Sequence, residues 1–269
     1  MRELPPVIRT IPGILREWSG AVRLAGDFRS LLRLLGDVLL FRVLGLIDLP
    51  GRNKERKVTF RDGTRIVYRL NRGDIQSIRE VWMERVYRLP VPMRPGLVVD
   101  LGANIGLTSL WLARQYGPRR IIAVEPSPEN ARLVRRNLSL NGVAASVIEA
   151  AVGPEDGTAL FNSSSDSNMG QLGSQGKPVT MISMASLLRE HAAGEPVALM
   201  KMDIEGGEQA LLTSHTEWLA RIPAIVAEFH PDRVDYPGLI ERLKAAGFTY
   251  LSPASSRDIP MDFFTRPAA

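Results

Sequence analysis

Val98-Val-Asp-Leu-Gly-Ala-Asn-Ile-Gly-Leu-Thr108 contains an apolar run, two spaced glycines and the start of a helical pattern. The apolar run predicts a buried strand, and the pattern beyond the glycines predicts a helix. Gly102 allows the chain to turn at the carboxyl end of the strand, and Gly106 allows the backbone to pass close to a ligand. Ligands of open α/β folds bind at that edge of the sheet. The stretch therefore predicts the first strand, loop and helix of a ligand-binding α/β domain.

The residues around this stretch alternate between strands and helices. Strands are predicted at 97–101, 121–125, 145–151, 197–203, 224–229, 248–251 and 261–265, and helices at 106–116, 128–141, 206–220 and 236–246. Continuous apolar strands separated by helices are typical of a sheet covered on both faces. We expect an α/β fold with a doubly wound, mostly parallel seven-stranded sheet that ends in an antiparallel hairpin. The Ser/Gly/Asn-rich segment 162–176 predicts a loop beside the sheet, with the composition of an active-site lid.

Residues 1–95 are predicted to form a small helical and β-hairpin appendage to a domain of residues 96–269. Apolar residues at helical spacing over 28–47 indicate an amphipathic helix, because four charged residues interrupt the run and exclude a membrane span. An alternating stretch around Asp62-Gly63 predicts a hairpin with a type I′ turn, and a helix over 74–87 follows. The proline-rich residues 89–95 mark the boundary.

Charge is distributed unevenly along the chain. Residues 1–97 have 19 basic and 10 acidic side chains, a balance of +9, whereas the remaining residues have 15 and 19, a balance of −4. The basic region can contact an anionic membrane or a polyanion, or it can be a solvated surface. The helix over 28–47 can pack on its own domain, lie on a membrane as a peripheral contact, or mediate a homodimer.

The chain contains no cysteine, which excludes disulfides, zinc–thiolate sites, iron–sulfur clusters and cysteine nucleophiles. Basic residues and prolines interrupt the N-terminal segment, so no signal peptide is expected. A cytoplasmic location, in part peripheral to a membrane, is the expectation.

The glycine loop differs from the loops that bind phosphates. Position 104 is Asn, where a dinucleotide-binding loop has a second glycine, and no P-loop sequence occurs in the chain. Asp100 at the strand end is expected to hold the loop and to meet a cationic amino group through water or backbone. Glu125 follows the second predicted strand, at the position where an acidic residue accepts hydrogen bonds from a ribose diol. Its alternative role is a partner for the start of the helix that begins at Ser127-Pro128.

These motifs resemble those of class I S-adenosylmethionine-dependent methyltransferases, and more narrowly of the FkbM family. The resemblance covers about residues 96–252 and rests on VVDLGANIGLTSL (98–110), AVEPSPENARLVRRNLSLN (123–141), AAVG (150–153), LMKMDIEGGEQALL (199–212) and IVAEFH (225–230). It implies O-methylation of a hydroxyl on a small molecule, natural product or glycan, with S-adenosyl-L-methionine as cofactor. The implied cofactor-binding residues are Asp100, Gly102, Ala103, Asn104, Gly106, Glu125, Pro126, Ala151 and Asp203. Members often have Thr-Leu-Asp where this chain has Ile182-Ser-Met184.

Acidic residues gather after the predicted strand 197–203, and His230 follows the next strand. Asp203 is placed to meet the methionine amino group or the substrate hydroxyl, and Glu205 can accept a proton or hold the loop. His230 is the histidine expected near the site, and its ordinary pKa of about 6.5 suits a general base, although it can equally be structural. We therefore predict His230, Asp203 and Glu205 as catalytic residues.

The carboxylates Asp203, Glu205 and Glu208 also fit a hard metal such as Mg²⁺. Lys201 lies two residues before Asp203 and supplies a competing positive charge, so no metal is expected, and a structural ion pair is the favoured role of this lysine.

Three other functions are consistent with parts of the sequence. The high isoelectric point, about 9.8, prompts a nucleic-acid methyltransferase. Against it, the predicted catalytic domain is acidic, and Asp203-Ile-Glu-Gly replaces the loop typical of base-amino methylation, so nucleic acid is not the expected partner. A non-catalytic scaffold that binds the cofactor is a second alternative, and an NAD-dependent dehydrogenase is a weaker third because the second glycine is missing.

Overall fold

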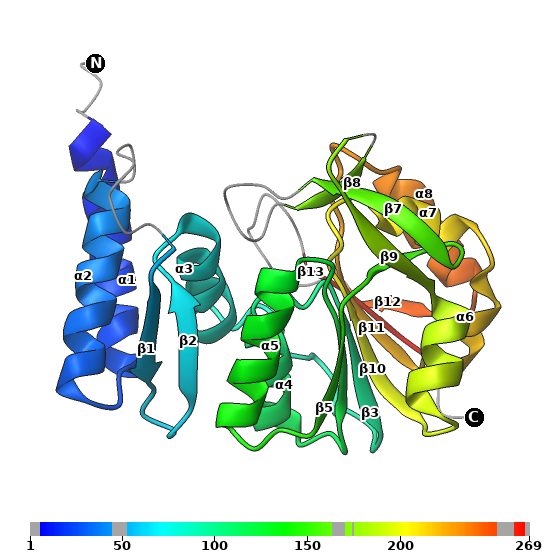
Figure 1. Ribbon diagram of the computed structural model, residues 1–269, viewed down its shortest axis with the longest axis horizontal. Coiled ribbons are helices and arrows are strands. Elements are labelled where there is room, and N and C mark those ends of the chain that lie inside the picture. The colour runs from blue at the N-terminus through cyan, green and yellow to red at the C-terminus, as the bar shows by residue number, and fades with distance from the viewer. Residues whose placement is uncertain (1–5, 45–52, 163–169, 174, 252–260, 267–269) are drawn as a thin grey trace. The chain divides into compact units, whose positions relative to one another are not determined.

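The computed structural model describes residues 6–44, 53–162, 170–173, 175–251 and 261–266 (Figure 1). The chain divides into two compact units, one ending at Arg85 and the other beginning at Val86. The proline-rich connector, at which the sequence analysis places the domain boundary, belongs to the second unit. In the described residues, no helix has both the length and the apolar character needed to cross a bilayer.

The first unit consists of a helical pair, a hairpin and a short helix. Its elements are α1 (Pro6–Leu24), α2 (Phe28–Leu44), β1 (Glu55–Thr59), β2 (Arg65–Arg69), α3 (Arg72–Ile78) and a π-helical turn, Arg79–Met83. Helix α1 was not predicted, because its interior contains Pro12 and Gly13, residues that normally disfavour helices. The helix predicted over 28–47 is α2, with residues 45–47 outside the described ones. Asp27 begins it, because its Oδ1 accepts the Ser30 N–H at 2.8 Å.

The predicted hairpin is confirmed, but its type I′ turn is wrong. Strands β1 and β2 pair antiparallel, and a loop of three residues joins Phe60 to Thr64. Gly63 has a φ of +81°, whereas Asp62 is outside the left-handed region that a type I′ turn needs at both central residues. The Asp62 Oδ1 instead accepts the Thr64 N–H at 2.9 Å.

The second unit contains the predicted seven-stranded sheet, in the order β12-β13-β11-β10-β3-β4-β5. These strands are β3 (Leu97–Leu101), β4 (Ile121–Val124), β5 (Ala145–Ile148), β10 (Val197–Met202), β11 (Ala224–Glu228), β12 (Thr249–Leu251) and β13 (Met261–Thr265). The five strands β5, β4, β3, β10 and β11 are parallel to their neighbours in this order. Strand β13 is antiparallel to both of its neighbours, β11 and β12. The doubly wound, mostly parallel α/β fold is therefore confirmed.

Helices cover both faces of this sheet. Helices α4 (Leu107–Tyr116) and α5 (Pro128–Leu140) lie on one side, and α6 (Met184–Leu187), α7 (Glu208–Thr213) and α8 (Tyr236–Ala245) lie on the other (Figure 1). A π-helical turn, Leu188–Ala192, continues α6. The helix predicted over 206–220 is interrupted, because His215 has a φ of +50° and a separate 3₁₀ helix, Thr216–Arg221, follows it.

A second sheet of four strands was not predicted. It is formed by β6 (Ala151–Gly153), β7 (Gly157–Asn162), β8 (Gln171–Gly173) and β9 (Lys177–Ser183), in the order β6-β9-β7-β8. The strand predicted over 145–151 is therefore divided, with Ala151 in this second sheet. No residue of β7 or β9 is buried, and their apolar runs are at most three residues long, which explains why the sequence pattern misses them. Most of the loop predicted over 162–176 lies outside the described residues, and its part 171–173 is β8.

Candidate active site

The glycine loop joins β3 to α4 and passes against the end of β10. Gly102 has a φ of +75°, and a Cβ at this position would lie 1.8 Å from the carbonyl oxygen of Asp203. Asn104 and Gly106 also have positive φ values, +50° and +81°. A Cβ at Gly106 would lie 3.1 Å from the Cα of Val134 in α5. Side chains are thus excluded at both glycines by backbone conformation and by close packing.

Lys201 and Asp100 form a buried ion pair beneath this loop. The Lys201 Nζ lies 3.2 Å from Asp100 Oδ1 and donates to the carbonyl oxygens of Gly102, at 2.7 Å, and Leu101, at 3.2 Å. Asp100 Oδ2 accepts the Ser109 hydroxyl at 2.5 Å. Burial opposes the charge of Lys201, but the carboxylates of Asp100 and Asp203 outweigh it and raise the pKa of the lysine. Lys201 thus forms the expected structural ion pair with Asp203, at 3.7 Å, and a closer one with Asp100. Asp100 contacts Lys201 and Ser109 in α4, so its link to the loop runs through Lys201.

Glu125 lies directly after β4 and is 4% exposed. Its Oε2 accepts the Asn104 N–H at 2.8 Å, and its Oε1 accepts the Ser127 N–H at 2.9 Å and the Asn130 side-chain amide at 3.4 Å. Burial raises the pKa of Glu125 to about 7, against these hydrogen bonds and the charge of Lys201. The contact with Ser127 is the helix-start role that the sequence analysis gave as the alternative. A carboxylate oxygen accepts two hydrogen bonds, so Oε2 retains capacity for a hydroxyl.

Asp203, Glu205 and His230 come together at the carboxyl ends of β10 and β11. His230 Nε2 lies 3.4 Å from Glu205 Oε2, and its Nδ1 lies 3.5 Å from Oε1 of the buried Glu208. Glu208 Oε1 also accepts the Ile204 N–H at 3.0 Å. The structure thus joins the three residues predicted as catalytic.

Arg233 is a further member of this cluster that the sequence analysis missed. Its Nη1 lies 2.9 Å from Glu205 Oε2 and donates to the Glu205 carbonyl oxygen at 3.1 Å. These contacts hold Glu205 in a left-handed conformation, with a φ of +56°. Asn130, which joins Glu125 to Asn104 through a 3.2 Å contact with Asn104 Oδ1, was also missed. No sequence signal marks either residue, because each is recognised only by its tertiary contacts.

Charges within the cluster change the protonation of its members. Burial would lower the pKa of His230, but contact with Glu208 and the charges of Asp203 and Glu205 raise it to about 9. Burial and the charge of Asp203 raise the pKa of Glu205 to about 7, against the positive charges of His230 and Arg233. Near pH 7, His230 is therefore mainly an imidazolium, whereas Glu205 is poised to gain or lose a proton.

Asp203, Glu205 and His230 also offer three ligand atoms within 4.8 Å of one another, so this group could hold a divalent cation. Lys201, 3.7 Å from Asp203, and Arg233 already place positive charge against two of these side chains. The expectation that no metal is used stays a prediction.

The remaining predicted cofactor residues lie at the same edge of the sheet. Ala103 is buried and its N–H donates to the Val124 carbonyl at 3.0 Å, and Pro126 is partly buried directly after Glu125. Ala151 is buried at the start of β6, three residues after β5 ends.

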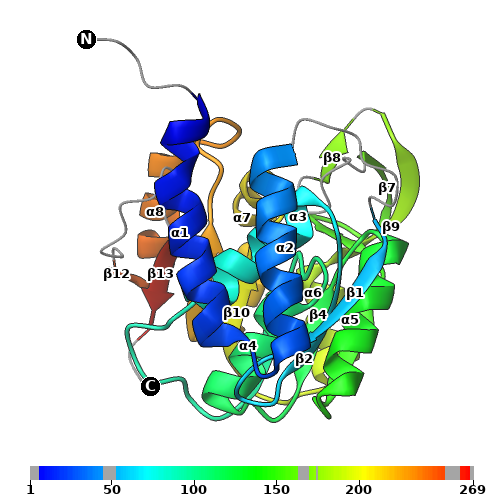
Figure 2. The ribbon, with the colours of Figure 1, turned by 90° about the vertical axis from the view of Figure 1, so that its left-hand side faces the viewer.

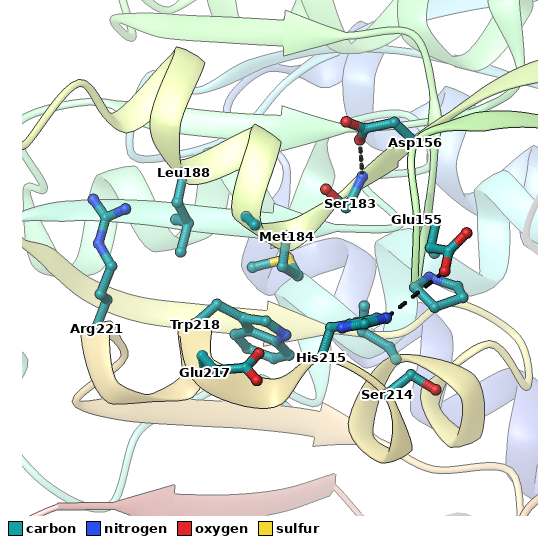
Figure 3. Close-up of a pocket in the computed structure, with 14 residues that line it drawn as sticks. Glu155, Asp156, Ser183, Met184, Leu188, Ser214, His215, Glu217, Trp218 and Arg221 are labelled. Atoms are coloured by element: carbon teal, nitrogen blue, oxygen red, sulfur yellow. Dashed lines mark hydrogen bonds and ion pairs between the residues drawn. The ribbon is translucent and has the colours of Figure 1, made fainter.

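A separate cavity of about 620 Å³ lies among β6, α6, α7 and the 3₁₀ helix (Figure 3). Met184, Leu188 and Trp218 give it an apolar floor, and His215 and Glu155 stand 3.7 Å apart at its rim. None of the predicted site residues lines this cavity. His215 thus lines this cavity and is not a member of the Asp203–Glu205–His230 cluster.

The strand order, the glycine loop after β3 and the acidic residue after β4 together define a class I methyltransferase fold. A sequence profile described as "Methyltransferase FkbM domain" matches residues 100–250. The chain belongs to the FkbM family of methyltransferases, and this fold implies S-adenosylmethionine as methyl donor.

Two relatives and one solved structure illustrate the similarity. The "31-O-demethyl-FK506 methyltransferase FkbM" of Streptomyces tacrolimicus is 25% identical over 226 residues, covering 69% of this chain and 86% of the relative. "Methyltransferase sdnD" of Sordaria araneosa is 37% identical over 82 residues, covering 30% of this chain and 31% of the relative. The structure of M. jannaschii TYW2 in complex with AdoMet has a TM-score of 0.45 and 15% identity, covering 81% of this chain and 90% of that chain.

Proposed function

We propose that this chain is an S-adenosylmethionine-dependent O-methyltransferase that acts on a hydroxyl of a small molecule, natural product or glycan. The observation that carries the proposal is the cluster of Asp203, Glu205 and His230 at the sheet edge that also bears the glycine loop. A hydroxyl must lose its proton as it is methylated, and this cluster offers both a proton acceptor and positive charge beside it.

The residues of the loop edge fit the methyl donor. Glu125 Oε2 has acceptor capacity for a ribose hydroxyl, and the Asp203 side chain is 24% exposed and available to an amino group. Lys201, paired with Asp100, holds the loop through the Gly102 carbonyl. Gly102 and Gly106 let the loop pack closely against Asp203 and Val134. S-adenosylmethionine supplies an activated methyl group, so alignment and proton removal are the protein's main tasks.

Glu205 is the proton acceptor that the electrostatics favour. A carboxylate with a pKa of about 7 suits a general base near neutral pH. His230 was the leading candidate from the sequence, but its pKa of about 9 leaves it protonated there. We therefore assign to His230, together with Arg233, the positioning of Glu205.

Titration calorimetry of the full chain with S-adenosylmethionine tests the cofactor, and mass spectrometry after incubation of cell extracts with isotopically labelled donor tests the acceptor. We expect binding, and a labelled methyl group on the oxygen of a small molecule or glycan. Absence of binding by folded protein would overturn the proposal. Label found in RNA or on a nitrogen would overturn the acceptor class.

A further inference from the structure

Helices α1 and α2 carry most of the large apolar side chains that the described part of the chain leaves open to solvent. Seven such side chains are exposed in the described part of the chain, and five of them lie on these two helices. They are Leu15 (58% exposed), Val22 (50%), Phe28 (72%), Leu32 (54%) and Leu39 (42%). Within each helix these residues are spaced along one stripe, and the two helices lie side by side (Figure 2). We call the five side chains together the α1–α2 apolar surface.

Helix α2 is apolar on two opposite sides. One side is buried in the first unit through Leu34 (3% exposed) and Val38 (4%). Beside them, Ser30 Oγ accepts the Thr59 N–H at 2.9 Å and Asp37 accepts the Tyr68 hydroxyl at 2.5 Å. The other side presents Phe28, Leu31, Leu32, Leu35 and Leu39, spaced as one helical stripe, with the outer members exposed. A helix that is apolar on both sides requires a cover for the second one.

Exposed arginines adjoin the exposed apolar residues of both helices. Each of four exposed apolar residues is followed directly by an exposed arginine, in the pairs Leu15-Arg16, Val22-Arg23, Phe28-Arg29 and Leu32-Arg33. The acidic residues nearby are differently placed, because Glu17 and Asp37 are buried and Asp27 is engaged in capping α2. The exposed face is therefore both apolar and positively charged.

We infer that the α1–α2 apolar surface docks on the surface of an anionic phospholipid membrane. Amphipathic helices that lie in the membrane interface combine inserted Phe and Leu side chains with flanking arginines that meet anionic headgroups. A second copy of the chain fits this surface less well, since two such faces would bring arginines against arginines. The charge balance of +9 in residues 1–97 adds long-range attraction to the same partner.

Flotation of the full chain with vesicles tests the inference. One vesicle contains phosphatidylglycerol and phosphatidylcholine in equal parts, and the other contains phosphatidylcholine alone. We expect binding to the anionic vesicles that weakens with salt, and at least about tenfold weaker binding for the double variant Phe28→Ser, Leu32→Ser. The variant Arg16→Glu, Arg29→Glu should lose binding as well.

Matched controls separate these effects from general destabilisation. Val91→Ser with Leu160→Ser changes two exposed apolar residues of the second unit, and Arg132→Glu with Arg136→Glu reverses charge on α5; both should bind as the unaltered chain does. Circular dichroism checks that each variant retains its helices. Equal binding to both vesicles, or equal loss in the controls, would overturn the inference. So would a dimer in solution that Phe28→Ser, Leu32→Ser converts to a monomer, because the surface would then be an interface between copies.

Discussion

Glu205 is the side chain on which proton removal depends in the proposed mechanism. Burial and the charge of Asp203 raise its pKa to about 7, against the lowering effect of His230 and Arg233. Glu208 lies on the other side of the His230 ring, next to Nδ1. The carboxylate accepts a proton only when ionised, so kcat should rise as pH increases through about 7. Glu205→Gln should lower kcat about a hundredfold or more and remove that rise, as measured by steady-state methyl transfer. Glu217→Gln, at an exposed position, is the control. An unchanged pH profile in Glu205→Gln would assign the base elsewhere.

Glu125 should make stability depend on pH. Burial raises its folded-state pKa from 4.5 to about 7, so the folded protein binds the proton more tightly than the unfolded chain. The resulting contribution to the free energy of unfolding is fully present below about pH 4.5 and is lost as pH rises through about 7. The loss amounts to at most about 3 kcal/mol. Urea unfolding should show a smaller decline between pH 5 and pH 8 in Glu125→Gln, which has no such proton to lose. Parallel declines in both proteins would contradict this. Glu125→Ala should also weaken cofactor binding.

The β3–α4 loop is the element whose shape depends most strictly on glycine. Gly102→Ala adds a Cβ that would lie 1.8 Å from the Asp203 carbonyl oxygen, in a conformation with a φ of +75°. We expect it to destabilise the fold by more than about 2 kcal/mol and to abolish cofactor binding.

Gly142→Ala is the matched control, because Gly142 has a φ of +65° with no atom within 4 Å of the added Cβ. It should cost only about 1 kcal/mol in thermal unfolding. Equal losses in the two variants would mean that the contact with Asp203 is unimportant.

At the level of the whole chain, the second unit should fold without the first. The large apolar cluster around the seven-stranded sheet is composed entirely of residues between Leu97 and Phe264. A fragment of residues 86–269 therefore retains this core, the glycine loop and the Asp203–Glu205–His230 cluster. We expect cooperative unfolding and cofactor affinity within about threefold of the full chain. Failure of the fragment to fold, with the full chain folded, would show that the first unit supplies part of the core.

Local patterns along the chain predict the central sheet well and the second sheet poorly. The strand at Leu97–Leu101 is buried on both faces, so every residue is apolar or paired, and its signal is strong. Strand β7 is exposed and gives no such signal. The same contrast applies to the site, where the glycine loop was recognised from its own residues and Arg233 was not.

The amino-acid sequence by itself determined which residues follow the ends of the strands, because strands and turns depend on neighbouring residues. The glycine loop and the acidic residues of the site were predicted in this way. The pairing of Lys201 with Asp100, and of His230 with two glutamates, depends on residues brought together by the sheet. Burial and charge among those partners shift the pKa values of His230 and Glu205 away from their ordinary values, and those shifts are the ground on which we propose Glu205 rather than His230 as the base. Only the folded chain contains that information, since a pKa responds to solvent exclusion and to nearby charge rather than to sequence neighbours.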